Sequence, residues 1–554
     1  MRFTFCAVLA MAVGLANASP PTAATEKGIY AGEHLPTFNQ DMFIGIRYAQ
    51  VPTGSLRFRP PRPLTKSWSG QKTAVNYGNS CYSSEPNTDN AFLTQSEDCL
   101  TLNIVRPSGY EGKKLPVGVW IHGGGFTSGV SFRDVYNLSY PVQQSVAGGT
   151  PIVAVSINYR VGPLGFLASE EVQKEGSLNN GLKDQVAALL WIKQNIEAFN
   201  GNSSQITIWG ESAGAESVSM LMLAYGGKLE SLFHRGIMQS GSATTQQYHP
   251  ISHWQEKYAI ITQLVGCDKQ SDTLDCLRQV DINKLVFMVN VAHERIKRHF
   301  APTIDGDFIL DWPKNLLQSG KFMKIPIISG ANMDEGTSFG PGRIFSTDEV
   351  KNWLNTAYAG LNSSSIQKIL TLYPDDPTEG SPFGTGNLYS GLIFGNQFKR
   401  GSAISGDITL IGPRRLSCEV WDKADLDVYS YNWNQSDYGV PGFFGTTHFQ
   451  EVIYVFDNPS TAFPQSSSFP MGPDPTGSKR RLGDLISRFF MAFIATGDPN
   501  NAKQNGTYPP WPKYSRENPK NYYFRENDIR IEIDDWRKEA ISFLNYDVGH
   551  QLLT

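Results

Sequence analysis

The chain has 554 residues, more than most single domains contain, and 40% of them are hydrophobic and 12% aromatic. This composition allows a large packed core. The formal net charge of −4 leaves no basic excess of the kind that binds phosphate backbones. We therefore expect a folded protein with no nucleic-acid partner.

The first residues have the pattern of a secretory signal. Arg2 is positive, residues 3–15 are apolar, and Ala16-Asn17-Ala18 forms a small-residue cleavage site. The apolar stretch is too short for a membrane-spanning helix, and residues 550–554 carry no retention or lipid-anchor motif. We expect residues 1–18 to be removed before Ser19, the protein to be secreted, and no stable membrane anchor to be present.

A run of glycines follows the first clear apolar strand. Residues 115–121 (Leu-Pro-Val-Gly-Val-Trp-Ile) read as a buried strand that leads into His122-Gly123-Gly124-Gly125. Consecutive glycines leave their backbone N–H groups unshielded, so a substrate oxygen can approach closely. Gly124 and Gly125 are therefore candidate oxyanion-hole donors, and the plain alternative is a flexible glycine turn.

Strands and helices are expected to alternate along the chain. Residues 151–157 are the clearest strand, and apolar residues recur at helical spacing over 181–199. This alternation is typical of an α/β fold with a large, mostly parallel sheet flanked by helices. Two stretches rich in Pro, Gly and Ser, 373–387 and 458–478, are expected to be long surface loops.

The most informative motif is Gly210-Glu211-Ser212-Ala213-Gly214, which follows the apolar run 206–209. A strand that enters Gly-x-Ser-x-Gly before a helix is the pattern of a nucleophile elbow, in which the serine hydroxyl stands clear of the backbone. Ser212 is thus the candidate nucleophile, and the N–H of Ala213 is a third oxyanion donor. Glu211 either tunes the site electrostatically or makes a structural hydrogen bond.

A serine nucleophile needs a base and an acid. A predicted strand at 325–330 precedes Asp334 and Glu335, and His448 lies further along the chain. Serine, then acid, then histidine is the chain order of α/β hydrolases. The acid is Glu335 or its neighbour Asp334, and a single domain is expected because the candidate residues are spread over the chain.

His448 has eight rivals among the nine histidines of the chain. His122 belongs to the glycine loop. The other seven have no matching sequence context: His34, His234, His249, His253, His293, His299 and His550.

The chain resembles type-B carboxylesterases, the α/β hydrolases that include cholinesterases and large fungal lipases. The similarity spans most of residues 19–554, through collinear motifs at 45–49, 56–61, 97–103, 158–162, 181–185, 239–241, 304–306 and 496–500, together with the segments described above. It implies one α/β-hydrolase domain, with Ser212 as nucleophile, His448 as base and then acid, and Glu335 as the acid. The family pattern Asp-Glu-Gly favours Glu335 over Asp334.

The cysteines suggest an oxidising compartment. Removal of Cys6 with the signal would leave five, whose connectivity the sequence alone does not determine. The resemblance implies the pairs Cys81–Cys99 and Cys267–Cys276, with Cys418 free. No cysteine or histidine pair has zinc spacing, so no metal and no cofactor are expected.

Glycosylation is also expected if the protein is secreted. The candidate acceptors are Asn137, Asn202, Asn362, Asn434 and Asn505. The residues carry no signal for an oligomeric state.

The segment between Cys81 and Cys99 bears on the substrate, because it resembles the family's lid or gorge-rim loop. Residues 82–93 are mostly polar, whereas an interfacial lipase needs a longer amphipathic flap. No tryptophan lies between Cys81 and Cys99, where it could hold a choline group by cation–π attraction. We expect a carboxylic ester hydrolase for soluble short-chain, medium-chain or aryl esters. The alternatives are an interfacial lipase or sterol esterase, a pathway-specific esterase or acyltransferase, and a non-catalytic binding protein.

Overall fold

The computed structural model describes residues 19–83, 93–291, 300–391, 393–459 and 470–552. The predicted signal peptide, residues 1–18, lies outside the described residues. So do residues 84–92 of the predicted polar loop and residues 460–469 of the second predicted surface loop.

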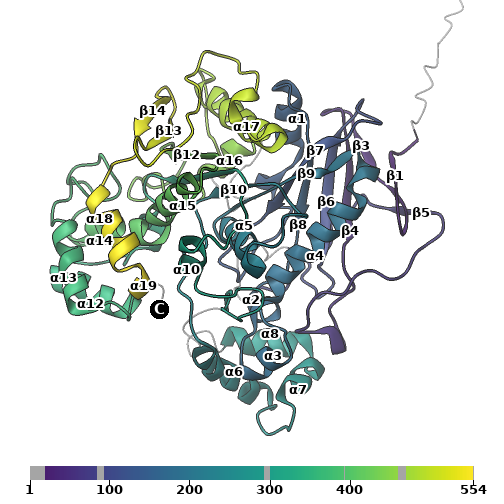
Figure 1. Ribbon diagram of the computed structural model, residues 1–554, viewed down its shortest axis with the longest axis horizontal. Coiled ribbons are helices and arrows are strands. Elements are labelled where there is room, and N and C mark those ends of the chain that lie inside the picture. The colour runs from purple at the N-terminus through teal and green to yellow at the C-terminus, as the bar shows by residue number, and fades with distance from the viewer. Residues whose placement is uncertain (1–18, 84–92, 292–299, 392, 460–469, 553–554) are drawn as a thin grey trace, which may run out of the picture.

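One sheet of eleven strands crosses the molecule in the order β14-β13-β12-β11-β10-β9-β7-β8-β6-β4-β3 (Figure 1). Neighbours from β13 to β8 run parallel, whereas β14 at one edge and β6, β4 and β3 at the other are antiparallel. The strands are β3 (Glu33–Leu35), β4 (Gln40–Arg47), β6 (Thr101–Pro107), β7 (Leu115–Ile121), β8 (Val153–Ile157), β9 (Gly201–Glu211), β10 (Arg235–Gln239), β11 (Ile327–Asn332), β12 (Val428–Trp433), β13 (Lys520–Phe524) and β14 (Arg530–Ile533).

A smaller sheet lies near the N-terminal end of the described chain. It has three strands in the order β1-β2-β5: β1 (Thr22–Thr25), β2 (Gly28–Ala31) and β5 (Gln71–Thr73).

The predicted strands are found with small shifts. β7 has the predicted bounds, while β11 begins at Ile327 because Pro326 has no N–H to donate to the ladder. The helix expected at 181–199 is α4 (Asn180–Asn195) followed by a 3-10 turn, Ile196–Phe199. The fold class is therefore confirmed as α/β, with a mostly parallel sheet between helices.

Each face of the sheet supports its own hydrophobic core, as the alternation of side chains along β7 shows. Val119 and Ile121 pack into the core beneath α4 and α5 (Ala213–Leu223). Trp120 points to the opposite face, where it meets Trp209 at 4.8 Å between ring centroids and joins the core under α17 (Ser478–Thr496). Burial of each such side chain contributes about 1.5–3 kcal/mol. A parallel sheet covered on both faces explains why these strands read as continuous apolar runs.

The remaining helices form two groups beside the sheet and a set of short or sheet-flanking helices (Figure 1). One group carries a third hydrophobic core and comprises α12 (Thr347–Ala357), α13 (Ser363–Leu372), α14 (Phe398–Gly406), α18 (Lys538–Ser542) and α19 (Gly549–Leu552). A second group comprises α3 (Glu170–Lys174), α6 (Ile251–Val265), α7 (Thr273–Gln279) and α8 (Ile282–Val291). Short or sheet-flanking helices complete the set: α1 (Ser139–Ala147), α2 (Gly162–Phe166), α10 (Pro313–Gln318), α11 (Gly336–Phe339), α15 (Gly412–Lys423) and α16 (Val452–Val455).

Disulfide bonds join Cys81 to Cys99 and Cys267 to Cys276, the two pairs that the resemblance implied. Cys418 is buried on α15 with a free thiol. Within the described ranges, no helix is both long enough and apolar enough to cross a bilayer.

The sheet order brings the candidate site together. The glycine loop follows β7, Ser212 follows β9, and Glu335 follows β11, and these strands lie within four adjacent positions of the sheet. Since the strands are parallel, their carboxyl ends meet at one edge, which is where α/β folds bind ligands.

Candidate active site

Ser212 occupies a strained turn between β9 and α5. Its backbone has φ 57° and ψ −127°, a combination that costs about 1–3 kcal/mol for a residue with a side chain. The flanking glycines make the turn possible. A Cβ on Gly214 would lie 2.1 Å from the carbonyl oxygen of Ile121, and one on Gly210 would lie 2.5 Å from the backbone of Gly214. Ser212 is half-buried, unlike the fully buried helix that follows it.

The glycine loop lies directly against this turn. A Cβ on Gly123 would approach the Cβ of Ser212 to 3.0 Å, while Gly124 and Gly125 are exposed with φ 108° and 60°. Ala213 is the first residue of α5, so its N–H has no partner within the helix and lies at the positive end of the helix dipole. The three N–H groups predicted for the oxyanion hole thus come from two segments that border Ser212.

Glu335 and His448 are hydrogen-bonded to each other. The imidazole Nδ1 lies 2.8 Å from Oε2 of Glu335, and the other oxygen of Glu335 accepts the backbone N–H of Asn332 at 2.8 Å. Glu335 is fully buried. A carboxylate at Nδ1 favours the tautomer with its proton on Nδ1, which leaves Nε2 as the basic nitrogen.

The second imidazole nitrogen faces Glu211. Nε2 of His448 lies 3.1 Å from Oε1 of Glu211, close enough for an ion pair, although the angles do not make a hydrogen bond. Within the described residues no hydrogen bond joins Ser212 to His448. Such bonds commonly tighten only when substrate binds. Phe339 of α11 holds the ring from the side, edge to face at 4.9 Å.

A third carboxylate, Glu451, completes a cluster that the motifs did not predict. It accepts hydrogen bonds from Asn332 Nδ2 at 2.8 Å and from Gln239 Nε2 at 3.2 Å, and it is fully buried. The sequence offers only two signals for this contact: Glu451 is three residues after His448, and Asn332 is three residues before Glu335. These spacings alone do not show that Asn332 and Glu451 are in contact.

The cluster changes the proton affinities of its members. Burial lowers the pKa of His448, but the carboxylates of Glu211 and Glu335 outweigh it and raise the pKa to about 10. Burial likewise raises the pKa of Glu211 well above its ordinary value, against the opposing effect of His448. Burial also raises the pKa of Glu451. Because these groups interact strongly, their protons belong to the cluster as a whole.

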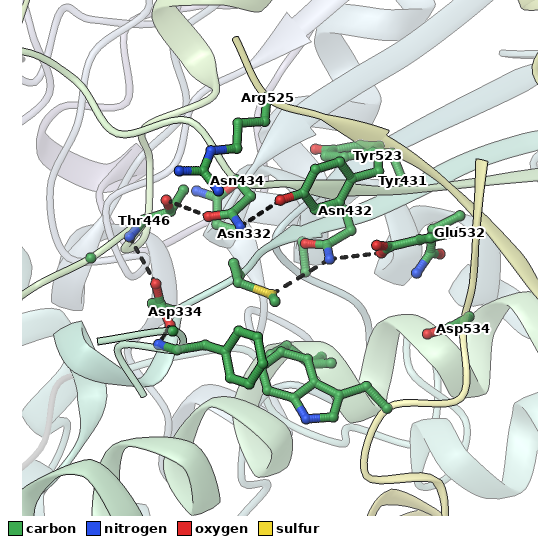
Figure 2. Close-up of a pocket in the computed structure, with 18 of the residues that line it drawn as sticks. Asn332, Asp334, Tyr431, Asn432, Asn434, Thr446, Tyr523, Arg525, Glu532 and Asp534 are labelled. Atoms are coloured by element: carbon green, nitrogen blue, oxygen red, sulfur yellow. Dashed lines mark hydrogen bonds between the residues drawn. The ribbon is translucent and has the colours of Figure 1, made fainter. Parts of the chain in front are cut away.

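Asp334, the competing acid, has a different position. Its two oxygens accept the backbone N–H groups of Phe383 at 2.8 Å and Thr446 at 3.0 Å (Figure 2). Burial raises its pKa to about 6. Asp334 therefore ties the loop before Glu335 to the loop before His448, and the structure brings Glu335, not Asp334, to the imidazole.

Four of the other histidines contact groups outside the candidate triad. His122 is buried, with Nδ1 2.9 Å from the carbonyl oxygen of Gly123 and its ring stacked on Tyr159. Burial lowers the pKa of His122 to about 4, so it is neutral at physiological pH. His34 contacts Asp41, and His249 stacks on His253. His293 and His299 lie outside the described residues.

The candidate glycosylation sites differ in accessibility. Three of them are exposed, at Asn137, Asn362 and Asn505, and Asn202 is half-buried. Asn434 is also half-buried, and its amide donates to Tyr523 Oη at 2.7 Å and accepts from Thr446 Oγ1 at 3.0 Å. A glycan on Asn434 would replace one hydrogen of this amide and leave a single N–H to donate. As to metals, the described residues contain no group of three or more His, Cys, Asp or Glu side chains placed to hold an ion.

Comparisons with known proteins identify the family of the whole chain. Residues 19–538 match the model of the carboxylesterase family. Lipase 2 of Geotrichum candidum is 34% identical over 564 aligned positions, which cover 92% of each chain. Secreted lipase 1 of Botryotinia fuckeliana is 34% identical over 86% of this chain and 84% of its own.

A solved structure is also similar over nearly its whole length. The crystal structure of Aspergillus niger EstA superimposes with a TM-score of 0.82 at 28% identity, covering 97% of this chain and 99% of that one. The family match, the relatives that align over most of their length and the shared fold agree with one another. The chain belongs to the carboxylesterase family and is a carboxylic ester hydrolase.

Proposed function

We propose that this protein is a secreted serine esterase with the triad Ser212, His448 and Glu335, acting through an acyl-enzyme. The observation that carries the proposal is the hydrogen bond at 2.8 Å between the buried carboxylate of Glu335 and His448, at the sheet edge where the strained turn presents Ser212. A buried carboxylate that orients an imidazole beside a nucleophile elbow is the arrangement that activates serine.

The reaction proceeds in two steps, acylation of Ser212 and hydrolysis of the acyl-enzyme. Ser212 Oγ attacks the ester carbonyl and passes its proton to His448 Nε2, and the oxyanion accepts N–H groups from Gly124, Gly125 and Ala213. His448 then returns the proton to the leaving alcohol, which leaves an acyl ester on Ser212. Water attacks that ester by the same sequence and releases the carboxylic acid. Each oxyanion donor is worth about 2.7–4 kcal/mol of barrier.

Glu335 and Glu211 have separate roles in this scheme. Glu335 holds the imidazole and balances the positive charge that forms on it. Glu211 faces Nε2, so its burial-raised pKa matters. In the ionised form Glu211 stabilises the imidazolium that forms when Nε2 takes the proton of Ser212, and in the protonated form it loses this effect.

For the substrate, we propose soluble short-chain, medium-chain or aryl esters, on the evidence of the polar segment 82–93. A lipase is the second candidate, because Lipase 2 of Geotrichum candidum and Lipase 4 of Diutina rugosa are each 34% identical to this chain. Residues 84–92, which would form the lid, lie outside the described residues.

The test is hydrolysis of a p-nitrophenyl ester series from acetate to palmitate by the wild type and Ser212→Ala. We expect fast turnover on short chains and a loss in the variant of more than about a thousandfold. Rates that peak at long chains and jump above the solubility limit would establish the lipase instead. Residual activity of the variant above a thousandth would reject Ser212 as nucleophile.

Secretion and domain organisation are also proposals. Residues 1–18 would be the signal and residues 19–554 a single domain, and two relatives are named as secreted: Secreted lipase 1 and Secreted triacylglycerol lipase LIP1 of Gibberella zeae. N-terminal sequencing of the protein recovered from culture medium should begin at Ser19. Retention in the cell with Met1 intact would contradict secretion.

A further inference from the structure

A large pocket with both polar and apolar lining lies next to the segments that hold Glu335 and His448. Figure 2 shows part of its lining. The pocket has a volume of about 640 Å³ and opens at the carboxyl ends of β11 and β12, next to β13 and β14. Ser212, Glu335 and His448 do not line it. A cavity of this size is in the range that holds small ligands.

Most charged side chains of the pocket have partners of opposite charge, either in the wall or outside the lining. Asp534 contacts both Arg414 and Arg415, and Tyr514 also donates to it. Arg537 pairs with Asp407, which lies behind the pocket wall, and Arg530 lies 3.4 Å from Glu532. Both oxygens of Asp334 are taken by backbone N–H groups.

A charged ligand would therefore compete with existing partners. Among the lining residues, Arg525 has no ion pair within the described chain, but it is exposed at the rim, where water and salt screen its charge. Figure 2 shows it on the same side as Asn434, away from Glu532 and Asp534. Because most of the wall charges are already paired, the pocket favours an uncharged occupant.

Four of the residues that line the pocket have hydrogen-bonding capacity that the described residues do not use. Each has one buried side-chain atom without a partner: the donors Arg414 Nε, Arg415 Nη1 and Arg537 Nη1, and the acceptor Asn332 Oδ1. A buried polar atom left unpaired costs about 1–3 kcal/mol. Hydroxyl groups both donate and accept, so they suit a wall that offers donors and acceptors together.

The rim adds apolar surface to these polar walls. Phe383 is 44% exposed and Ile533 is 60% exposed, and both line the pocket. The Phe383 ring packs on Trp536 with 4.4 Å between centroids. Ligands with hydroxyl edges and C–H faces match such a mixture of surfaces.

From these observations we infer that the pocket binds a neutral polyhydroxylated ligand, a saccharide of one or two rings. Such a ligand would contact the segments that hold the catalytic side chains, because Asn332, Asp334 and Thr446 are all wall residues. Asn332 donates hydrogen bonds to both Glu335 and Glu451. Thr446, which is two residues before His448, donates its backbone N–H to Asp334. Occupancy would stabilise this arrangement and raise kcat. The effect on kcat rests on the proposed function, whereas binding does not.

Binding is measured first, by calorimetric titration of the full chain with glucose, maltose and cellobiose, and with phosphate and citrate as anionic probes. We expect saturable binding of at least one saccharide, unchanged in Ser212→Ala. Binding of the anions alone would overturn the ligand class, and binding of none of the probes would overturn the site.

Two matched variants locate the site. Ile533→Trp adds bulk to an exposed strand position at the mouth and breaks no hydrogen bond, and should weaken binding at least tenfold. Ile29→Trp makes the same change at another exposed strand position, outside the pocket, and should bind like the wild type. Equal affinity in all three proteins would place any binding elsewhere.

The effect on catalysis is measured on the wild type with p-nitrophenyl butyrate at saturating saccharide. An increase in kcat that Ile533→Trp loses and Ile29→Trp keeps supports the coupling. Unchanged kcat despite binding would overturn the coupling. If the protein hydrolyses no ester, the proposed function fails, while the calorimetric result still decides the site.

Discussion

Two buried charge clusters on adjacent parts of the same sheet have opposite compositions. Around His448, one titratable cation faces three carboxylates, those of Glu335, Glu211 and Glu451. Around Asp534, one carboxylate faces two guanidinium groups, those of Arg414 and Arg415. Both clusters are assembled from residues more than a hundred positions apart.

The difference lies in whether the excess charge can lose a proton. Burial opposes ionisation of Asp534, but Arg414 and Arg415 outweigh it and hold the pKa of Asp534 well below its usual range. Arginine does not deprotonate in proteins, so this cluster keeps one charge state and serves as structure. Burial raises the pKa values of Glu211 and Glu451, and nearby carboxylates raise the pKa of His448. This cluster therefore consists of groups that can gain or lose a proton. Excess carboxylate around a histidine suits catalysis, and excess guanidinium around an aspartate suits stability.

The largest effect is expected from removing the carboxylate that orients His448 in the proposed triad. Glu335→Gln keeps the shape but loses the carboxylate at Nδ1, which permits the wrong tautomer of His448. We expect kcat to fall about 10⁴-fold, roughly 5 kcal/mol, with little change in the melting temperature. Steady-state kinetics and calorimetry measure the two quantities. Loss of less than tenfold would reassign the acid.

In the second cluster the same kind of change should affect stability instead. Asp534→Asn leaves two guanidinium groups buried without their counter-charge, at an expected cost of about 3–5 kcal/mol of unfolding free energy. The control is Asp427→Asn, which breaks an exposed ion pair with Lys513 and should leave stability nearly unchanged. Denaturant titration compares the two variants.

The pH dependence sharpens this prediction. The folded pKa of Asp534 is depressed, so its contribution is present above the unfolded pKa of about 3.9 and is lost as pH falls through the folded value. Asp534→Asn should therefore lose more stability at pH 7 than below pH 4. A loss independent of pH would show that the carboxylate charge is not the cause.

A smaller effect is expected from the carboxylate beside Nε2. Glu211 raises the pKa of His448, and the base must be neutral to act. Glu211→Gln should lower that pKa and move the acidic limb of the kcat/KM profile to lower pH, with a loss at the optimum of about tenfold, roughly 1.4 kcal/mol. An unshifted limb would mean that Glu211 is not ionised in the working enzyme.

The smallest effect tests the geometry of the arginines. Arg415→Lys keeps the positive charge but loses the forked contact with Asp534 and the bond to the carbonyl oxygen of Trp536. We expect a loss of about 1 kcal/mol in unfolding free energy and no change in kcat. A loss as large as that of Asp534→Asn would show that hydrogen bonding, more than charge, holds the cluster together.

Much of the fold followed from local pattern. β7 was predicted to the residue because its apolar run is bounded by polar residues and glycine, and the nucleophile turn was predicted because only glycines fit beside it. Glu451 and Asn332 were not identified as site residues. Each has an ordinary local context, and their bond joins residues that the chain separates by more than a hundred positions. The family pattern favoured Glu335 over Asp334 as the acid. In the structure the two neighbours differ in the direction of their side chains, because Glu335 points to His448 and Asp334 points to backbone N–H groups.

By itself the sequence determined the strands, the turn at Ser212, the glycine loop and the order of the candidate residues, since these depend on local periodicity and on backbone sterics. The tertiary structure decided that Glu335 contacts His448 while Asp334 ties two loops together, that Glu211 and Glu451 surround the same imidazole, and that Asp534 lies between two arginines. The reason is physical: burial and charge proximity set these properties, and both exist only after distant strands are adjacent in the sheet.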